Sequence, residues 1–134
     1  MADFQRPDRE FHVAGFRPAE RELIVRSDSS ALLGLGTRIE VYFGRVDFMC
    51  LRSVYQGLHV RPATGEEFDR IAGTYGIPEE DRDCTYMLAD DGVSFVVSAR
   101  PAWAEAELLN REPSLFDFFH TWDPEPVVER GNVD

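Results

Sequence analysis

Residues 37–53 constrain the fold more than any other stretch, because apolar and polar side chains alternate along them. A period of two residues is typical of a β-strand that buries one face. Gly44 and Arg45 interrupt the alternation, and a two-residue connection that begins with glycine suits a tight hairpin turn. The sequence therefore predicts a β-hairpin. Its inward side chains are expected to pair across the strands as Phe43 with Val46, Val41 with Phe48, and Ile39 with Cys50.

Further strands are expected on both sides of this hairpin. Short apolar-rich runs bounded by turn residues predict strands at 10–16, 22–26 and 54–61, and a second hairpin at 84–100. The first two of these strands are expected to pair antiparallel. The glycine- and serine-rich residues 27–36 are expected to form a loop.

The clearest helix is predicted at about 64–75. Thr64 and Glu67 have the spacing of a capping box, in which each side chain satisfies a backbone donor of the first turn. Gly76 suits the left-handed position after the last turn, and Pro78 prevents continuation. The apolar residues of the segment fall on one helical stripe, which must be buried against the sheet. They are Phe68, Ile71, Ala72 and Tyr75.

Two shorter helices are expected near the C-terminus. Pro101 suits a first helical position, so residues 102–109 form the first candidate. In residues 115–122 the apolar side chains again recur at helical spacing. This aromatic segment has two interpretations: it packs on the open sheet face, or it is exposed and docks into a groove on a partner. Phe116 and Trp122 are the candidate hydrophobic anchors in the second case.

Together these patterns predict a single α+β domain spanning residues 1–134. Its main part is an antiparallel sheet of five to seven strands in a hairpin meander. One amphipathic helix packs on a face, and one or two short helices lie near the C-terminus. The polar residues 1–9 and 124–134 are expected to be flexible ends.

The charge of the chain is strongly negative and unevenly spread. The formal net charge is −11, and because residues 1–61 carry +1, residues 62–134 carry −12. Direct binding to nucleic acid is disfavoured, since phosphate contacts need a cationic face. A surface of this sign is either a solvated, solubilising one or a patch that steers a basic partner. The carboxylates expected to do the steering are Glu79, Glu80, Asp81, Asp83, Asp90 and Asp91.

Motifs that carry catalytic or metal chemistry are not found. All 14 cationic residues are arginine, so lysine chemistry is ruled out. The three histidines and two cysteines are scattered without ligand spacing, and we expect neither a metal nor a cofactor. Cys50 and Cys84 are expected to be buried thiols. The absence of a long apolar run and of a secretory signal argues against a membrane location and favours the cytoplasm.

Three functional hypotheses remain. The leading one is a non-enzymatic protein-binding module, in its most specific form a small acidic inhibitor, like a bacterial immunity protein, that masks a basic site. The first alternative is a structural component that assembles into homo-oligomers. The second is a small-molecule binder or enzyme with a carboxylate–arginine pocket on the sheet. The pocket residues would come from the outer face of the 37–53 hairpin, where Glu40 and Asp47 flank Tyr42.

Overall fold

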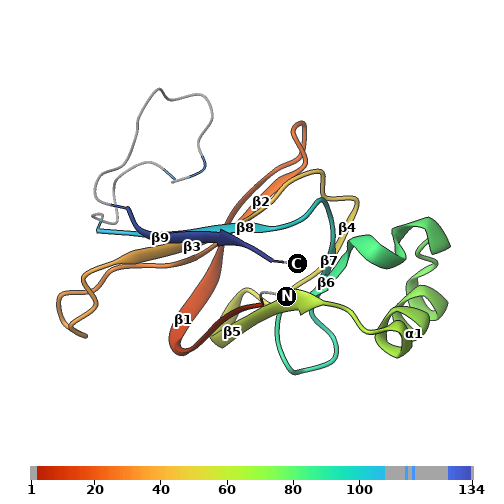
Figure 1. Cartoon of the computed structure of the whole chain (residues 1–134), viewed down its shortest axis with the longest axis horizontal. Helices are drawn as coiled ribbons and strands as arrows, with labels where there is room; N and C mark the ends of the chain where they lie inside the picture. The colour runs from red at the N-terminus through yellow and green to blue at the C-terminus, as the bar shows by residue number, and fades with distance from the viewer. Residues whose placement is uncertain (1–2, 108–113, 115, 117–126, 134) are drawn as a thin grey trace.

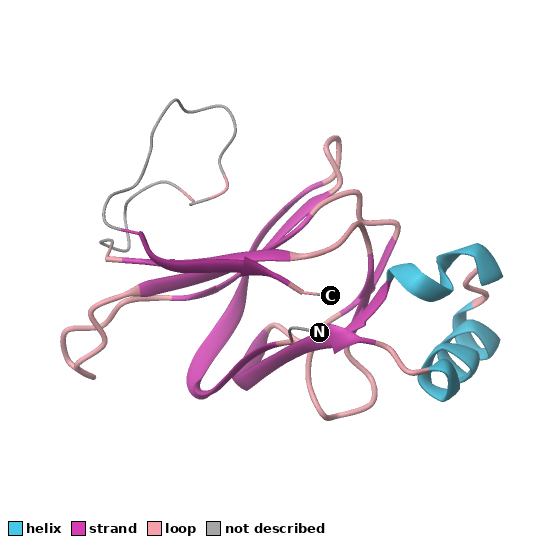
Figure 2. Cartoon of the chain, in the orientation of Figure 1, coloured by secondary structure: helices cyan, strands magenta, loops and turns pink. Residues whose placement is uncertain are grey.

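The computed structural model describes residues 3–107, 114, 116 and 127–133. Within these residues the chain forms one nine-stranded antiparallel sheet, one α-helix and one 3₁₀ helix (Figures 1 and 2). The strands are β1 (Phe4–Arg17), β2 (Glu22–Ser27), β3 (Arg38–Phe43), β4 (Phe48–Cys50), β5 (Val54–Pro62), β6 (Thr85–Met87), β7 (Phe95–Val97), β8 (Ala102–Ala106) and β9 (Val127–Asn132). The helices are α1 (Gly65–Tyr75) and the 3₁₀ helix η1 (Glu79–Cys84). The antiparallel sheet is as expected, but it has more strands than the predicted five to seven.

The sheet runs in the order β4-β7-β6-β5-β1-β2-β3-β8-β9, and β1 joins its two halves. The first part of this 14-residue strand pairs with β5 and the last part with β2. Phe4 and Phe11 are buried in the main core with their rings edge to face. The described part of the expected flexible N-terminus is therefore mostly strand. At the other end, β9 lies within the expected flexible tail, and Val133 is fully buried.

The predicted central hairpin is wrong, although its inward-facing side chains are largely right. β3 pairs with β2 and β8, whereas β4 pairs with β7 in the other half of the sheet. Arg45, not Gly44, takes the positive φ of 53°, and the Gly44 carbonyl accepts a hydrogen bond from Ala99. The chain therefore crosses between the halves at this point instead of turning back. Alternation determines which face of a strand is buried, but it does not determine the neighbouring strand.

The predicted helix at 102–109 is also wrong where the structure describes it, because residues 102–106 form strand β8 between β3 and β9. Helix propensity is a weak preference that neighbouring strands override when they offer a full ladder of backbone hydrogen bonds. The alanines of β8 stand opposite the polar residues of β3: Ala106 pairs with Arg38, Ala104 with Glu40 and Ala102 with Tyr42. Of the helix predicted at 115–122, all but Phe116 lies outside the described residues.

The predicted helix at 64–75 is confirmed by α1. Thr64 and Glu67 form the capping box, and Gly76 closes the helix with a φ of 72°. The buried side chains of α1, Phe68 and Ile71, pack with Met87, Phe95 and Val97 of β6 and β7. These two strands are paired as expected for the second hairpin, and their opposite face joins the main core. The strands predicted at 22–26 and 54–61 are present as β2 and β5.

The two cysteines differ from expectation. Both are free thiols, but Cys50 is only half-buried and Cys84 is exposed at the end of η1. The prediction of two buried thiols is therefore wrong. Cys84 is exposed because η1 continues through it and the strand expected there begins only at Thr85.

Candidate partner-binding site

Exposed carboxylates gather on the helical end of the molecule, where α1 and η1 project beyond β6 and β7 (Figure 1). Residues 65–84 contain seven acids and two arginines, a net charge of −5. We call the exposed carboxylates of this end the acidic surface. They are Glu66, Asp69, Glu79, Glu80 and Asp83.

Three of the predicted steering residues, Glu79, Glu80 and Asp83, belong to this acidic surface. Asp81 lies in η1 with them but is half-buried. Glu66 and Asp69 were missed by the sequence analysis. The helical periodicity contained the necessary signal, because it places both residues away from the apolar stripe of α1.

Arg82 fixes η1 against α1. Its guanidinium lies 4.7 Å from the centroid of the buried Phe68 ring, and it forms ion pairs of 2.7 Å with both Asp69 and Glu79. The hydrogen bond from Arg82 lowers the pKa of Glu79. Within the described part of the chain, Glu66, Glu80 and Asp83 have no ion-pair partner. The acidic surface therefore combines a fixed backbone with carboxylates that are not neutralised.

Glu67 has a different role from its neighbour Glu66. Its two carboxylate oxygens accept hydrogen bonds of 2.7 and 2.8 Å from Arg61, and one of them also accepts from the backbone of Thr64. The hydrogen bonds from Arg61, the largest cause, together with those at the cap, lower the pKa of Glu67 to about 2. Glu67 therefore holds the start of α1 in place.

Asp90 and Asp91 lie on the loop between β6 and β7, apart from η1 in the chain. The Asp91 carboxylate accepts hydrogen bonds from the backbone of Val93 and Ser94 and from the Ser94 hydroxyl. Burial would raise the pKa of Asp91, but these hydrogen bonds outweigh it and lower the pKa. Asp91 thus caps the turn. Asp90 is exposed, and its carboxylate lies 3.5 Å from His59 Nδ1.

Of the two predicted aromatic anchors, Phe116 lies against the sheet. Its ring stacks on Tyr42 with centroids 5.2 Å apart and an interplanar angle of 19°. For this residue the structure fits packing on the sheet face better than insertion into a partner. Trp122 lies outside the described residues.

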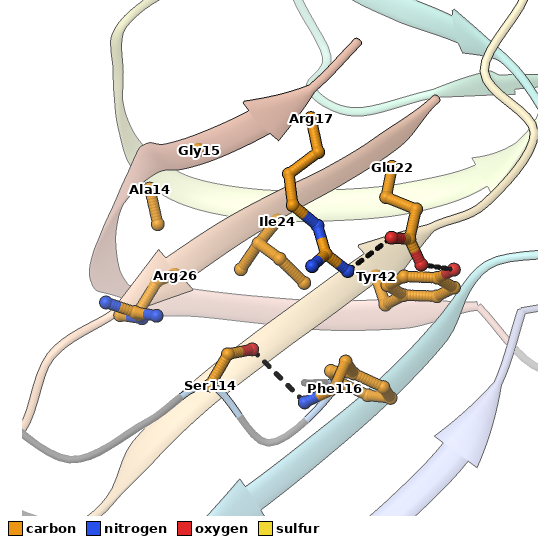
Figure 3. A pocket seen from close by; sticks show the side chains of 9 residues that line it. All are labelled: Ala14, Gly15, Arg17, Glu22, Ile24, Arg26, Tyr42, Ser114 and Phe116. Atoms are coloured by element: carbon orange, nitrogen blue, oxygen red, sulfur yellow. Dashed lines mark hydrogen bonds and ion pairs between the residues drawn. The ribbon is translucent and has the colours of Figure 1, made fainter. Parts of the chain in front are cut away.

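The outer face of β2 and β3 carries a network of charges, and Figure 3 shows the part of it around Glu22 and Tyr42. Glu40 is fully buried and accepts hydrogen bonds from Arg26 at 2.8 Å and from Ser114 at 2.6 Å. The Tyr42 hydroxyl donates to Glu22, which also pairs with Arg17.

Burial, reinforced by Glu22, raises the pKa of Tyr42 to about 12. Asp47, which was expected beside Tyr42, instead pairs with Arg21.

A pocket of about 200 Å³ opens on this charged face. Figure 3 shows Ile24 between Arg17 and Arg26, with Ser114 and Phe116 across from them. The pocket lining is Ala14, Gly15, Arg17, Glu22, Ile24, Arg26, Tyr42, Ser114 and Phe116. Of the three residues that the sequence analysis assigned to a pocket on this face, only Tyr42 is in the lining, and the carboxylate and arginines of the pocket come from β1 and β2.

The part of the chain that the structure describes contains neither a metal-binding cluster nor a membrane-spanning helix. No cluster of three or more histidine, cysteine or carboxylate side chains there is arranged to hold a metal ion. No helix there has the length and apolar character needed to cross a bilayer. Comparison with known proteins finds no match among protein-family models, curated proteins or solved structures.

Proposed function

We propose that the chain is a non-enzymatic protein-binding module whose acidic surface binds a basic site on a partner protein. The observation that carries this proposal is the set of exposed carboxylates, Glu66, Glu80 and Asp83, on a helical unit that Arg82 fixes to the sheet-packed helix α1. A small acidic inhibitor of the immunity type, which masks a basic site on its target, is the specific form we favour.

The fixed geometry of this surface supports the proposal. Charges held in place lose little conformational freedom on binding, and a field of one sign accelerates encounter with a partner of the opposite sign. The Arg82 guanidinium pairs with Asp69 and Glu79, and so does not neutralise the neighbouring carboxylates of the acidic surface. Binding of this kind is expected to weaken with added salt, because exposed charges are screened over about 8 Å at physiological ionic strength.

The experiment is affinity capture of the tagged protein from its own cells at low and high salt. We expect one stoichiometric basic partner at low salt, and its loss at high salt. The variant E66Q/E80Q/D83N should capture much less of it. The matched control E20Q/E107Q/E129Q removes the same charge from exposed positions elsewhere and should capture it normally. Equal capture by the two variants would contradict the proposal.

A second candidate function is binding of a small molecule in the pocket on the charged face. The observation that favours it is the combination of an apolar floor at Ile24 with arginines on either side. The variant Ile24→Phe would fill this space without removing a charge. A small carboxylate that raises the melting temperature of the wild-type protein, but not of Ile24→Phe, would support this function.

Homo-oligomer formation remains a prediction, which sedimentation would test.

A further inference from the structure

The loop between β2 and β3 exposes a pair of leucines. Leu32 is 94% exposed and Leu33 is 72% exposed, and the flanking Ala31 and Gly34 are exposed as well. In Figure 1 this loop projects from the sheet at the end of the molecule opposite α1. Consecutive exposed leucines at a projecting tip are a common mark of an interaction surface, unlike single scattered apolar residues.

The tip is held by hydrogen bonds at its base. The Arg9 guanidinium donates to the Ser27 hydroxyl at 3.0 Å and to the Thr37 carbonyl at 2.8 Å, which joins the two sides of the loop. Ser30 and Leu35 exchange two backbone hydrogen bonds of 2.8 Å nearer the tip. The leucines are therefore presented by a fixed turn, so burying them against a partner requires little further ordering.

A groove of about 450 Å³ lies beside the tip. Leu33 and Leu35 line it from the loop, and Asp8, Glu10 and Asp28 line it with carboxylates. Among the described residues its lining contains no arginine and one histidine, His12, whose Nε2 lies 3.8 Å from the Asp28 carboxylate. The tip thus combines an apolar projection with an adjacent acidic recess.

Exposed leucines could contact a second copy of the chain, a membrane or a different protein, and the negative charge of the groove distinguishes between these three. A second copy of the chain would bring its own Asp8, Glu10 and Asp28 close to the same residues, and like charges repel. An anionic membrane surface would be repelled in the same way. A protein with an apolar pocket beside basic residues satisfies both parts of the surface.

We infer that Leu32 and Leu33 insert into an apolar pocket of a basic partner protein, while the adjacent groove receives a cationic side chain of that partner. This inference rests on the proposed function and adds to it a second, hydrophobic contact at the end of the molecule opposite the acidic surface. It places the anchor on the β2–β3 loop and not on the segment that contains Phe116.

The test is photo-crosslinking in the cells of origin, with a photoreactive phenylalanine analogue in place of Leu32 or, separately, of Glu80. We expect position 32 to cross-link to one partner protein with a basic surface. Leu33→Ser should reduce this product roughly tenfold, as expected for loss of one buried leucine. D8N/E10Q/D28N should also reduce it, whereas E20Q/E107Q/E129Q should not. Unchanged melting temperatures would show that the variants fold.

The other outcomes separate this inference from the proposed function. A cross-link from position 80 without one from position 32 would overturn the inference and leave the acidic surface as the binding site. A product containing two copies of the chain, or lipid, at position 32 would overturn it in favour of self-association or a membrane. The absence of cross-links from both positions would contradict both proposals.

Discussion

The two ends of the molecule differ in which side chains they present, although a single arginine fixes each of them. At one end Arg82 ties η1 to α1, and at the other Arg9 joins the two sides of the β2–β3 loop. The helical end buries Phe68 and Ile71 and exposes carboxylates, whereas the loop end exposes leucines. The difference arises because α1 packs on β6 and β7, while the loop extends beyond the sheet and no described element covers its tip.

An apolar side chain is buried only where another element covers it. Phe68 and Ile71 contact the strands that α1 crosses, so their burial stabilises the fold. Leu32 has no such contact within the described structure, so its apolar area can contribute only to binding.

The largest expected effect on stability comes from removing a buried side chain at the helical end, compared with an exposed one at the loop tip. Phe68→Ala should lower the free energy of unfolding by about 3–5 kcal/mol, because it leaves a cavity under α1. Leu32→Ala should change it by less than about 0.5 kcal/mol, since the side chain is in water. Denaturant titration of both variants measures the difference. A loss of stability in Leu32→Ala similar to that in Phe68→Ala would show that the leucine is packed in solution.

An intermediate effect is expected from the arginine at the base of the loop. Arg9→Ala should lower stability by about 1–3 kcal/mol, because the hydrogen bonds to Ser27 and Thr37 come from a charged donor. Hydrogen exchange at Ser30 and Leu35 should accelerate more than exchange in α1. Arg70→Ala, an exposed change of the same charge on α1, provides the control. If the two variants exchange equally at Ser30, Arg9 does not hold the tip.

A smaller, pH-dependent effect is expected at the start of α1. Because the folded-state pKa of Glu67 is lowered from 4.5 to about 2, its pairing with Arg61 contributes stability above pH 4.5. That contribution should be lost as the pH falls from 4.5 towards 2. Glu67→Gln keeps a side chain able to cap the helix but removes the charge, and should cost about 1 kcal/mol at neutral pH.

Denaturant titration across this pH range is the measurement, and the two proteins should converge near pH 2. Glu66→Gln, the same change at the adjacent exposed position, should follow the wild-type curve. Parallel curves for wild type and Glu67→Gln would contradict the assigned role of the Arg61 pair.

The helix α1 could be predicted because its signals are local in the sequence. The capping box, the apolar stripe and Gly76 all lie within 13 residues. The structure confirms the capping box and Gly76, and it buries Phe68 and Ile71 of the stripe, whereas Tyr75 is 44% exposed. The pairing of β3 could not be predicted in the same way. Its alternation identifies Ile39, Val41 and Phe43 as inward-facing, but β2 and β8 are neighbours that only the complete fold determines.

The candidate site was predicted in part for a similar reason. A sequence shows where acidic residues are consecutive, as in η1, but it does not show which of them are bound within the fold. Asp90 and Asp91 are also consecutive acids, yet the Asp91 carboxylate caps a turn. The Leu32–Leu33 pair was visible as an apolar run inside an expected loop. A sequence does not show whether such residues fold back onto the core, because that depends on how far the loop extends from the sheet.

We propose that exposed carboxylates at the helical end steer a basic partner. The most direct measurement is the association rate with the captured partner as a function of salt concentration, for the wild-type protein and for E66Q/E80Q/D83N. We expect the wild-type rate to fall steeply with added salt, and the variant to associate more slowly at low salt with a shallower dependence. A wild-type rate that is independent of salt, or a variant that matches it at every concentration, would contradict the claim.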